Sequence, residues 1–136
     1  MFVQQISVFL ENTKGSLSRI TRVLSQNKID LIALSIADTE HYGILRGIVS
    51  DTEKAVSIHK EAGYTVKLTD VLAVCVPDEP GGLASVLTLM NAADISIEYL
   101  YSFVRSSGSH ALVIFRVTDP QRAIQVLEEA GIKLLD

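Results

Sequence analysis

The chain has 136 residues, of which 48% are apolar and 21% are charged, and its formal net charge is −4. This length suits one ordinary domain or two small ones, and the apolar content is that of a globular protein rather than a disordered one. The basic residues are scattered, and no apolar run approaches the ~20 residues of a membrane span, so we expect a cytoplasmic protein that binds neither nucleic acid nor membrane.

The first half of the chain predicts a strand, a helix and a hairpin, in that order. Apolar residues alternate over 6–10, which is typical of a half-buried strand, and recur at helical spacing over 17–24. Two stretches of period two, over 30–38 and 42–50, flank the polar turn DTEHYG. We therefore expect these two stretches to pair as a hairpin.

A second helix is expected from Asp51, which suits an N-cap, to Gly63, a residue typical of helix C-termini. A short strand over 64–68 completes the series strand–helix–strand–strand–helix–strand. The second half of the chain shows the same series of periods. Its elements are expected over 72–76, 82–92, 95–105, 110–117, 119–130 and 132–135.

An internal repeat accounts for this second series. At an offset of 66 residues Gly15 falls on Gly81, and at an offset of 68 the tripeptide Glu-Ala-Gly at 61–63 falls on its copy at 129–131. The extra two residues are expected in the turn SSGSH, because Gly and Ser mark sites that tolerate insertion. We therefore predict an α+β protein of two tandem ferredoxin-like βαββαβ units. Their expected bounds are 1–69 and 70–136. Each unit is small enough that its core is marginal alone, so we expect the two units to pack on each other.

Both helices of such a unit lie on one face of its antiparallel sheet, because the crossovers are right-handed. If Ile32, Leu34 and Ile36 face the helices, the other face carries small residues in the first unit and aromatic residues in the second. These are Ala33, Ser35 and Ala37 in the first unit, and Tyr99, Tyr101 and Phe103 in the second. Three uncovered aromatic side chains form a large apolar patch, so we expect a homodimer or larger assembly. A register shifted by one residue would instead bury them in the core.

Each first helix follows a strand and a glycine loop, ENTKG in one copy and PDEPGG in the other. The first backbone N–H groups of a helix lack partners within it, so they form a site for an anion such as a carboxylate, and glycine lets a ligand approach the main chain. The alternative is that Asn12, Ser16 or Asp78 caps the helix and the glycines only form a turn. The spacing matches neither phosphate-binding glycine motif.

The stretches LENTKGSLSRITRVLSQNKIDL and VPDEPGGLASVLTLMNAADISI, each within a βαββαβ unit, resemble two tandem ACT domains. The resemblance covers essentially the whole chain and implies a regulatory protein that binds a free L-amino acid between paired domains. The residues that it implies as ligand contacts are Asn12, Thr13, Lys14, Gly15, Ser16 and Leu17 in the first loop, Asp78, Gly81, Gly82 and Leu83 in the second, and Ser96 at the start of a strand.

Two departures from the family pattern bear on this site. Asp30 and Ser96 stand where the family commonly has Asn, and Lys14 stands where the second loop, like the family, has proline, Pro80. Lys14 favours a carboxylate, whereas Asp78 repels one and suits an ammonium group. One amino acid bridging the first loop and the strand of the second copy, with Tyr99 or Tyr101 along its side chain, would satisfy both charges.

Catalytic, metal and cofactor chemistry find no support in the residues. Cys75 lies within a predicted strand without a neighbouring histidine, and the three histidines have no ligand spacing. RNA-recognition domains and metal carriers share the βαββαβ order, but their aromatic-basic and CxxC motifs are missing here. We expect a protein that is not an enzyme and acts on a separate partner enzyme. The rival hypothesis is a structural pairing module that binds no ligand.

Overall fold

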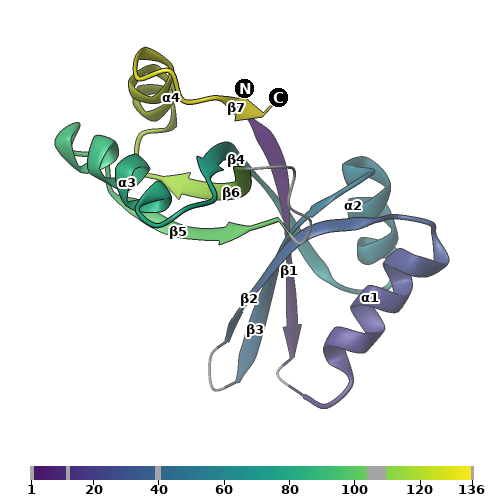
Figure 1. Cartoon of the computed structure of the whole chain (residues 1–136). Coiled ribbons are helices and arrows are strands. Elements are labelled where there is room, and N and C mark those ends of the chain that lie inside the picture. Colours follow the sequence, from purple (N-terminus) through teal and green to yellow (C-terminus); the bar gives the residue numbers. More distant parts are fainter. Residues whose placement is uncertain (1, 12, 39–40, 104–109, 136) are drawn as a thin grey trace. The chain divides into compact units, whose positions relative to one another are not determined.

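The fold is described from a computed structural model, which covers residues 2–11, 13–38, 41–103 and 110–135 (Figure 1). The chain divides into two compact units. The first unit comprises Gln4–Thr69, and the second comprises Asp70–Asp136 together with Met1–Val3.

The first unit is a four-stranded sheet with two helices on one side (Figure 1). In chain order it contains β1 (Val3–Glu11), α1 (Ser16–Gln26), β2 (Leu31–Asp38), β3 (Tyr42–Val49), α2 (Thr52–Glu61) and the start of β4 (Thr65–Pro77). The strand order is β2-β3-β1-β4, and β3 pairs antiparallel with both β1 and β2. The unit therefore has the predicted βαββαβ order.

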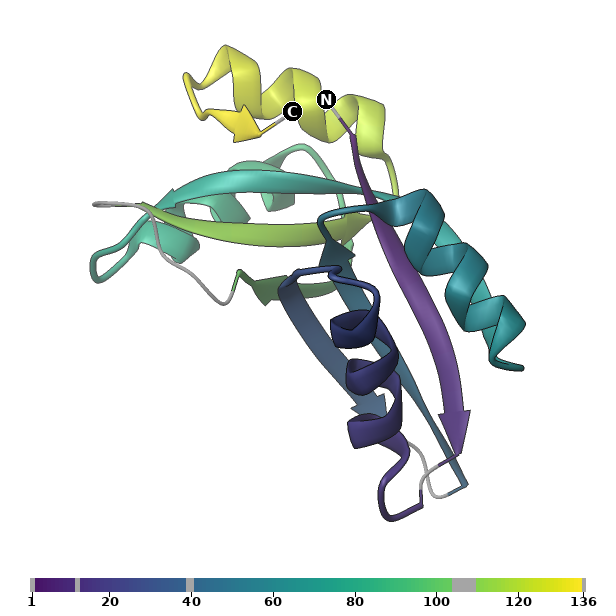
Figure 2. The ribbon, with the colours of Figure 1, turned by 90° about the vertical axis from the view of Figure 1, so that its right-hand side faces the viewer.

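The second unit repeats this plan with a shorter final strand. It contains the remainder of β4, followed by α3 (Gly82–Ala92), β5 (Ile97–Ser102), β6 (His110–Val117), α4 (Pro120–Glu129) and β7 (Leu134–Leu135). The strand order is β4-β6-β5, and β7 pairs antiparallel with β4 on the side away from β6. The start of β1 lies beside β7 (Figures 1 and 2), and Phe2 packs against the core of this unit.

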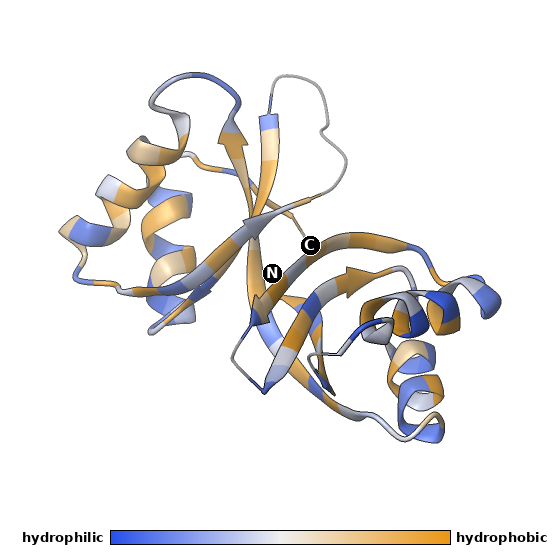
Figure 3. Ribbon diagram, turned by 90° about the horizontal axis from the view of Figure 1, so that it is seen from below, coloured by the Kyte–Doolittle hydropathy of each residue, from blue (hydrophilic) through white to orange (hydrophobic). Residues whose placement is uncertain are grey.

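Each unit has its own hydrophobic core between its helices and its sheet. Residues of alternate positions along the strands form one side of each core, and one stripe of each helix forms the other. In Figure 3 the strands are mostly orange, whereas the helices carry both colours. The fully buried side chains include Ile6, Val8, Ile20 and Leu24 in the first core, and Leu72, Met90, Phe115 and Leu127 in the second.

The two strands expected over 64–68 and 72–76 form the single strand β4, which has 13 residues and passes from one unit to the other. Between them the chain reads Thr69-Asp70-Val71, with no glycine or proline to end a strand. Because nothing in this stretch favours a turn, the extended backbone continues through it.

The faces of the hairpin strands are as predicted, with one local addition. Ser35 pairs with Arg46 and Tyr101 with Ile114, on the side of each sheet away from the helices. Both copies have a register shift at the same place, between Leu31 and Ala33 and between Ile97 and Tyr99. The shift leaves Leu31 paired with Val49 and packed against the core, so Leu31 is added to the residues that face the helices. The expected facing of Ile32 stays a prediction.

Candidate functional site

The two glycine loops have the same backbone conformation. Gly15 has φ 88° and Gly81 has φ 86°, in the left-handed region that favours glycine. In the first loop Thr13 N donates to Glu11 O at 2.8 Å, and in the second Glu79 N donates to Pro77 O at 3.0 Å. The internal repeat therefore extends to the hydrogen bonds of the loops.

Helices α1 and α3 begin differently from α2 and α4. Asp51 and Asp119 cap α2 and α4 by accepting hydrogen bonds from Lys54 N and Arg122 N, each at 3.1 Å. The N-cap residues of α1 and α3 are glycines, and within the described residues neither helix receives a side-chain cap. Ser16 N donates to Thr13 O at 3.2 Å and Gly82 N donates to Glu79 O at 3.0 Å. Among the described residues, the next two N–H groups of α1 and of α3 are therefore the ones that remain for another partner.

A cavity of about 750 Å³ opens at the start of α1, within the first unit. The end of β1, the first turns of α1, the start of β3 and the turn between α2 and β4 surround it. Its lining residues are Phe9, Leu10, Glu11, Thr13, Ser16, Arg19, Val23, Tyr42, Ala62, Gly63, Tyr64 and Thr65.

Two of the predicted ligand residues, Thr13 and Ser16, line this cavity. Ser16 is only 8% exposed, and its hydroxyl lies 2.7 Å from the Thr13 hydroxyl. Lys14, Gly15 and Leu17 are exposed but do not line the cavity. Asn12 lies outside the described residues, so its predicted role stays a prediction.

Sequence reasoning missed Arg19, together with Glu11, Tyr42 and Tyr64, as cavity residues. A signal for Arg19 was present, because Ser16, Arg19 and Val23 recur at helical spacing and so share one face of α1. Tyr64 had no such signal, since it lies far from α1 in the sequence and approaches it only through the fold.

The second loop differs from the first where its helix begins. A Cβ atom placed on Gly82 would overlap the carbonyl oxygen of Pro77, so the start of α3 lies directly against the end of β4. The equivalent position in the first loop is Ser16, which carries a side chain. Of the predicted residues in the second loop, Gly82 is buried, whereas Asp78, Gly81 and Leu83 are exposed.

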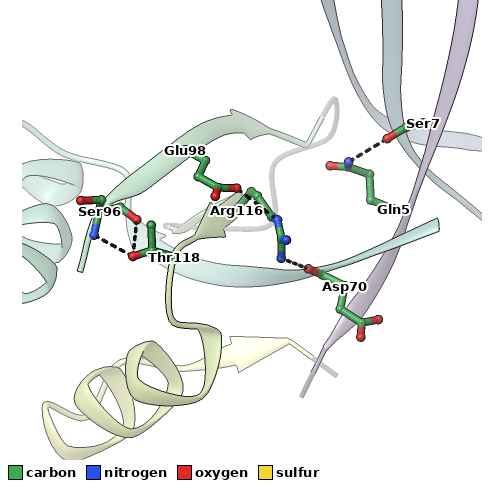
Figure 4. Close-up of polar contacts among 7 residues, drawn as sticks. All are labelled: Gln5, Ser7, Asp70, Ser96, Glu98, Arg116 and Thr118. Atoms are coloured by element: carbon green, nitrogen blue, oxygen red, sulfur yellow. Dashed lines mark hydrogen bonds and ion pairs between the residues drawn. The ribbon is translucent and has the colours of Figure 1, made fainter. Parts of the chain in front are cut away.

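The strand-start residues Asp30 and Ser96 have backbones engaged in matching hydrogen bonds. Asp30 N donates to Ser50 Oγ at 2.9 Å, and Ser96 N donates to Thr118 Oγ1 at 3.2 Å. Thr118 N donates in turn to Ser96 O at 3.0 Å. Figure 4 shows this Ser96–Thr118 pair, and it shows Gln5 Nε2 donating to Ser7 Oγ on β1. These contacts hold the hairpin strands, and contact of Ser96 with a ligand stays a prediction.

Tyr99 and Tyr101 lie on the face of β5 away from the helices of the second unit. Their rings stack with centroids 6.5 Å apart and an interplanar angle of 18°. Tyr101 is 8% exposed, and Tyr99 and Phe103 are half-buried. The same face carries Arg116, which pairs with Glu98 at 3.3 Å and donates to the carbonyl of Asp70 (Figure 4). Contact of the two tyrosines with a ligand stays a prediction.

The described residues show neither a metal site nor a membrane span. No group of three His, Cys, Asp or Glu side chains in that part of the chain could hold a metal ion. No helix there is long and apolar enough to cross a bilayer.

The two units and their loops define a tandem pair of ferredoxin-like βαββαβ domains. The sequence matches the ACT domain pair family over residues 1–136, so the chain belongs to the ACT domain family. ACT domains are regulatory domains, and the resemblance of the chain to this family is thereby confirmed.

Solved structures agree with this assignment. Protein BT0572 from Bacteroides thetaiotaomicron is 42% identical, with a TM-score of 0.93 over 99% of this chain and 92% of its own. The ligand-free regulatory subunit of aspartate kinase from Thermus thermophilus has a TM-score of 0.66 at 11% identity, over 93% of this chain and 91% of its own. The corresponding subunit from Thermus flavus has a TM-score of 0.64 at 12% identity, over 94% of this chain and 92% of its own. The last two likenesses concern the fold alone. No protein of curated function matches the sequence.

Proposed function

We propose that this protein is a non-catalytic regulatory sensor of a free L-amino acid and acts on a separate partner enzyme. The ligand's polar end binds at the first glycine loop, with its carboxylate at the N-terminus of α1. The regulatory character of the family supports the role, and the aspartate kinase subunits that share the fold are themselves regulatory subunits.

The observation that carries this proposal is an uncapped helix start that opens on a cavity. The N-terminus of α1 lacks a side-chain cap among the described residues, and Ser16 lines a space of about 750 Å³ beside it. A carboxylate there gains ~0.3–1 kcal/mol from the helix dipole, in addition to hydrogen bonds from the backbone. Lys14, which lies next to Gly15, adds a positive charge that attracts the carboxylate.

We also propose that the protein assembles as a homodimer. Leu34 and Ile36 on the edge strand β2 are 36% and 40% exposed, and the matching Leu100 on β5 is 38% exposed. Apolar side chains on sheet edges favour burial against another chain. The same residues favour the second candidate function, a pairing module that binds no ligand. Light scattering would test the assembly by comparing the solution mass with the 14.8 kDa of one chain.

A thermal-shift screen with each of the twenty L-amino acids tests the sensor. A ligand of so few atoms is expected to bind in the micromolar to millimolar range, so the screen needs about 10 mM of each. At 100 times its dissociation constant, a ligand stabilises the folded state by ~2.7 kcal/mol, which raises the melting temperature of a chain of this length by several degrees. If no amino acid moves the melting temperature, the pairing-module alternative replaces the sensor.

A matched pair of variants tests whether the ligand binds at the first loop. Ser16→Leu puts a bulky side chain at a buried position that lines the cavity, so it should abolish the shift. Ser18→Leu, in the same helical turn but exposed and outside the cavity, should keep it. Each variant is compared with its own melting temperature without ligand. Equal shifts in both variants would contradict binding at the first loop.

A further inference from the structure

We infer that the cavity of the first unit is the single ligand site of each chain, that Arg19 binds the ligand's carboxylate, and that the ligand is an L-amino acid with an apolar side chain. This inference rests on the proposed sensor function. It goes further by assigning one loop, one recognition residue and one ligand class.

Charge of both signs lines the cavity. Arg19 reaches it from the second turn of α1, and Glu11 lines it at the end of β1. Both residues are exposed, and within the described residues neither is engaged in an ion pair. A guanidinium binds a carboxylate through two parallel hydrogen bonds, and the start of α1 favours negative charge at the same place. The Glu11 carboxylate attracts the ammonium group of the same zwitterion.

The rest of the lining combines apolar and aromatic side chains with hydroxyl groups. Phe9, Leu10, Val23, Tyr42 and Tyr64 contribute aliphatic and aromatic surface from two strands, from α1 and from the turn after α2. The volume of about 750 Å³ lies within the range of pockets that hold small molecules. A ligand whose backbone groups are held by Arg19 and Glu11 would place its side chain against this surface, where an apolar side chain is favoured by burial.

The second loop differs from the first at the positions of Arg19 and Ser16. At the repeat offset of 66 residues, Ser85 stands in place of Arg19, and Gly82 in place of Ser16. Ser85 Oγ donates to the carbonyl of Gly82 at 2.7 Å, and Gly82 lies against the Pro77 carbonyl without room for a Cβ atom. Asp78 and Glu79 repel a carboxylate in this loop. One ligand per chain follows from this difference.

The test is titration calorimetry on the full chain with L-valine, L-leucine, L-isoleucine, L-methionine and L-phenylalanine, and with L-aspartate, L-lysine and L-serine for comparison. At least one apolar amino acid should bind with a stoichiometry near one per chain, and more tightly than the three polar ones. Arg19→Gln should weaken that binding by at least about tenfold, the factor that corresponds to 1.4 kcal/mol. Arg22→Gln is the matched control, because Arg22 is exposed on the same helix and does not line the cavity.

Each contrary result is distinct. Binding that survives Arg19→Gln as well as it survives Arg22→Gln, or two ligands per chain, would overturn this inference while the sensor function stands. Preference for a polar amino acid would overturn the assigned ligand class. If none of the eight binds, the inference fails, and the screen of all twenty amino acids decides separately whether the sensor function fails with it.

Discussion

Single residues explain why two loops of the same backbone conformation differ as binding sites. Gly15 and Gly81 are both required by a positive φ, and a Cβ atom on either would meet no atom within 4 Å. Gly82 has another reason to be glycine, because the Pro77 carbonyl occupies the place of a side chain. A side chain at that position is compatible with the first loop, where Ser16 stands, and incompatible with the second.

This difference predicts unequal costs for two neighbouring substitutions. Gly81→Ala should lower the free energy of unfolding by ~1–2 kcal/mol, the usual cost of the left-handed region for a residue with a Cβ atom. Gly82→Ala should cost more, since the helix start must move away from β4, and overpacking of this kind costs ~1–3 kcal/mol or above. Urea unfolding of both variants measures the difference. A smaller cost for Gly82→Ala than for Gly81→Ala would contradict the close contact with Pro77.

Buried polar atoms mark a second difference between the copies. His59 is fully buried, with Nδ1 2.7 Å from the Ala55 carbonyl oxygen, and its Nε2 atom has no partner among the described residues. The Tyr64 hydroxyl is also buried, and the part of the chain that the structure describes offers it no partner. The second copy has the apolar residues Leu127 and Ile132 at these positions. An unpaired buried polar group costs ~1–3 kcal/mol, so the first core is the less favourably built of the two.

At the scale of elements, the four helices fall into two classes by how they begin. Asp51 and Asp119 end the connections before α2 and α4 and cap these helices with their own side chains. The glycines before α1 and α3 provide no such cap. An uncapped start therefore leaves one more N–H group of the first turn without a side-chain acceptor than a capped start does.

For the two capped helices, α2 and α4, we predict the same effect in both copies. Asp51→Ala and Asp119→Ala should each lower the free energy of unfolding by ~0.5–2 kcal/mol, because each removes the acceptor of one N–H group in the first turn. Glu53→Ala, an exposed first-turn change that leaves the cap intact, is the control and should cost less. Thermal unfolding followed by calorimetry gives the change in the free energy of unfolding for each of the three variants. A cap removal without cost would show that Lys54 N or Arg122 N has another partner.

At the scale of the molecule, the chain connects its two units through shared elements rather than through a linker. The strand β4 belongs to the first unit up to Thr69 and to the second from Asp70. The residues before Gln4 group with the second unit, and Phe2 packs against its core. A cut between residues 69 and 70 would therefore divide β4 and would separate residues 1–3 from the second unit.

Expression of residues 1–69 tests this organisation. The fragment keeps the first core but carries Phe2 and Val3 without the core against which Phe2 packs, and β4 ends after five of its 13 residues. It should unfold at a lower temperature and less cooperatively than the whole chain, because a unit of this size buries too little apolar surface for independent stability. Calorimetry on the fragment and on the whole chain measures the unfolding temperature and the cooperativity of each. A fragment that melts cooperatively at the temperature of the whole chain would show that the units are independent.

The sequence by itself determined the repeat, the order of elements, the strand faces and the positions of both glycine loops, because period and turn residues act locally. Only the tertiary structure decided that β4 is continuous, that Ile32 lies at a register shift, and that Gly82 lies against the Pro77 carbonyl. It also decided that Arg19 and Tyr64 line one cavity. Their positions depend on how α1 packs against a turn that lies some forty residues later in the chain, and no local pattern contains the distance between two such segments.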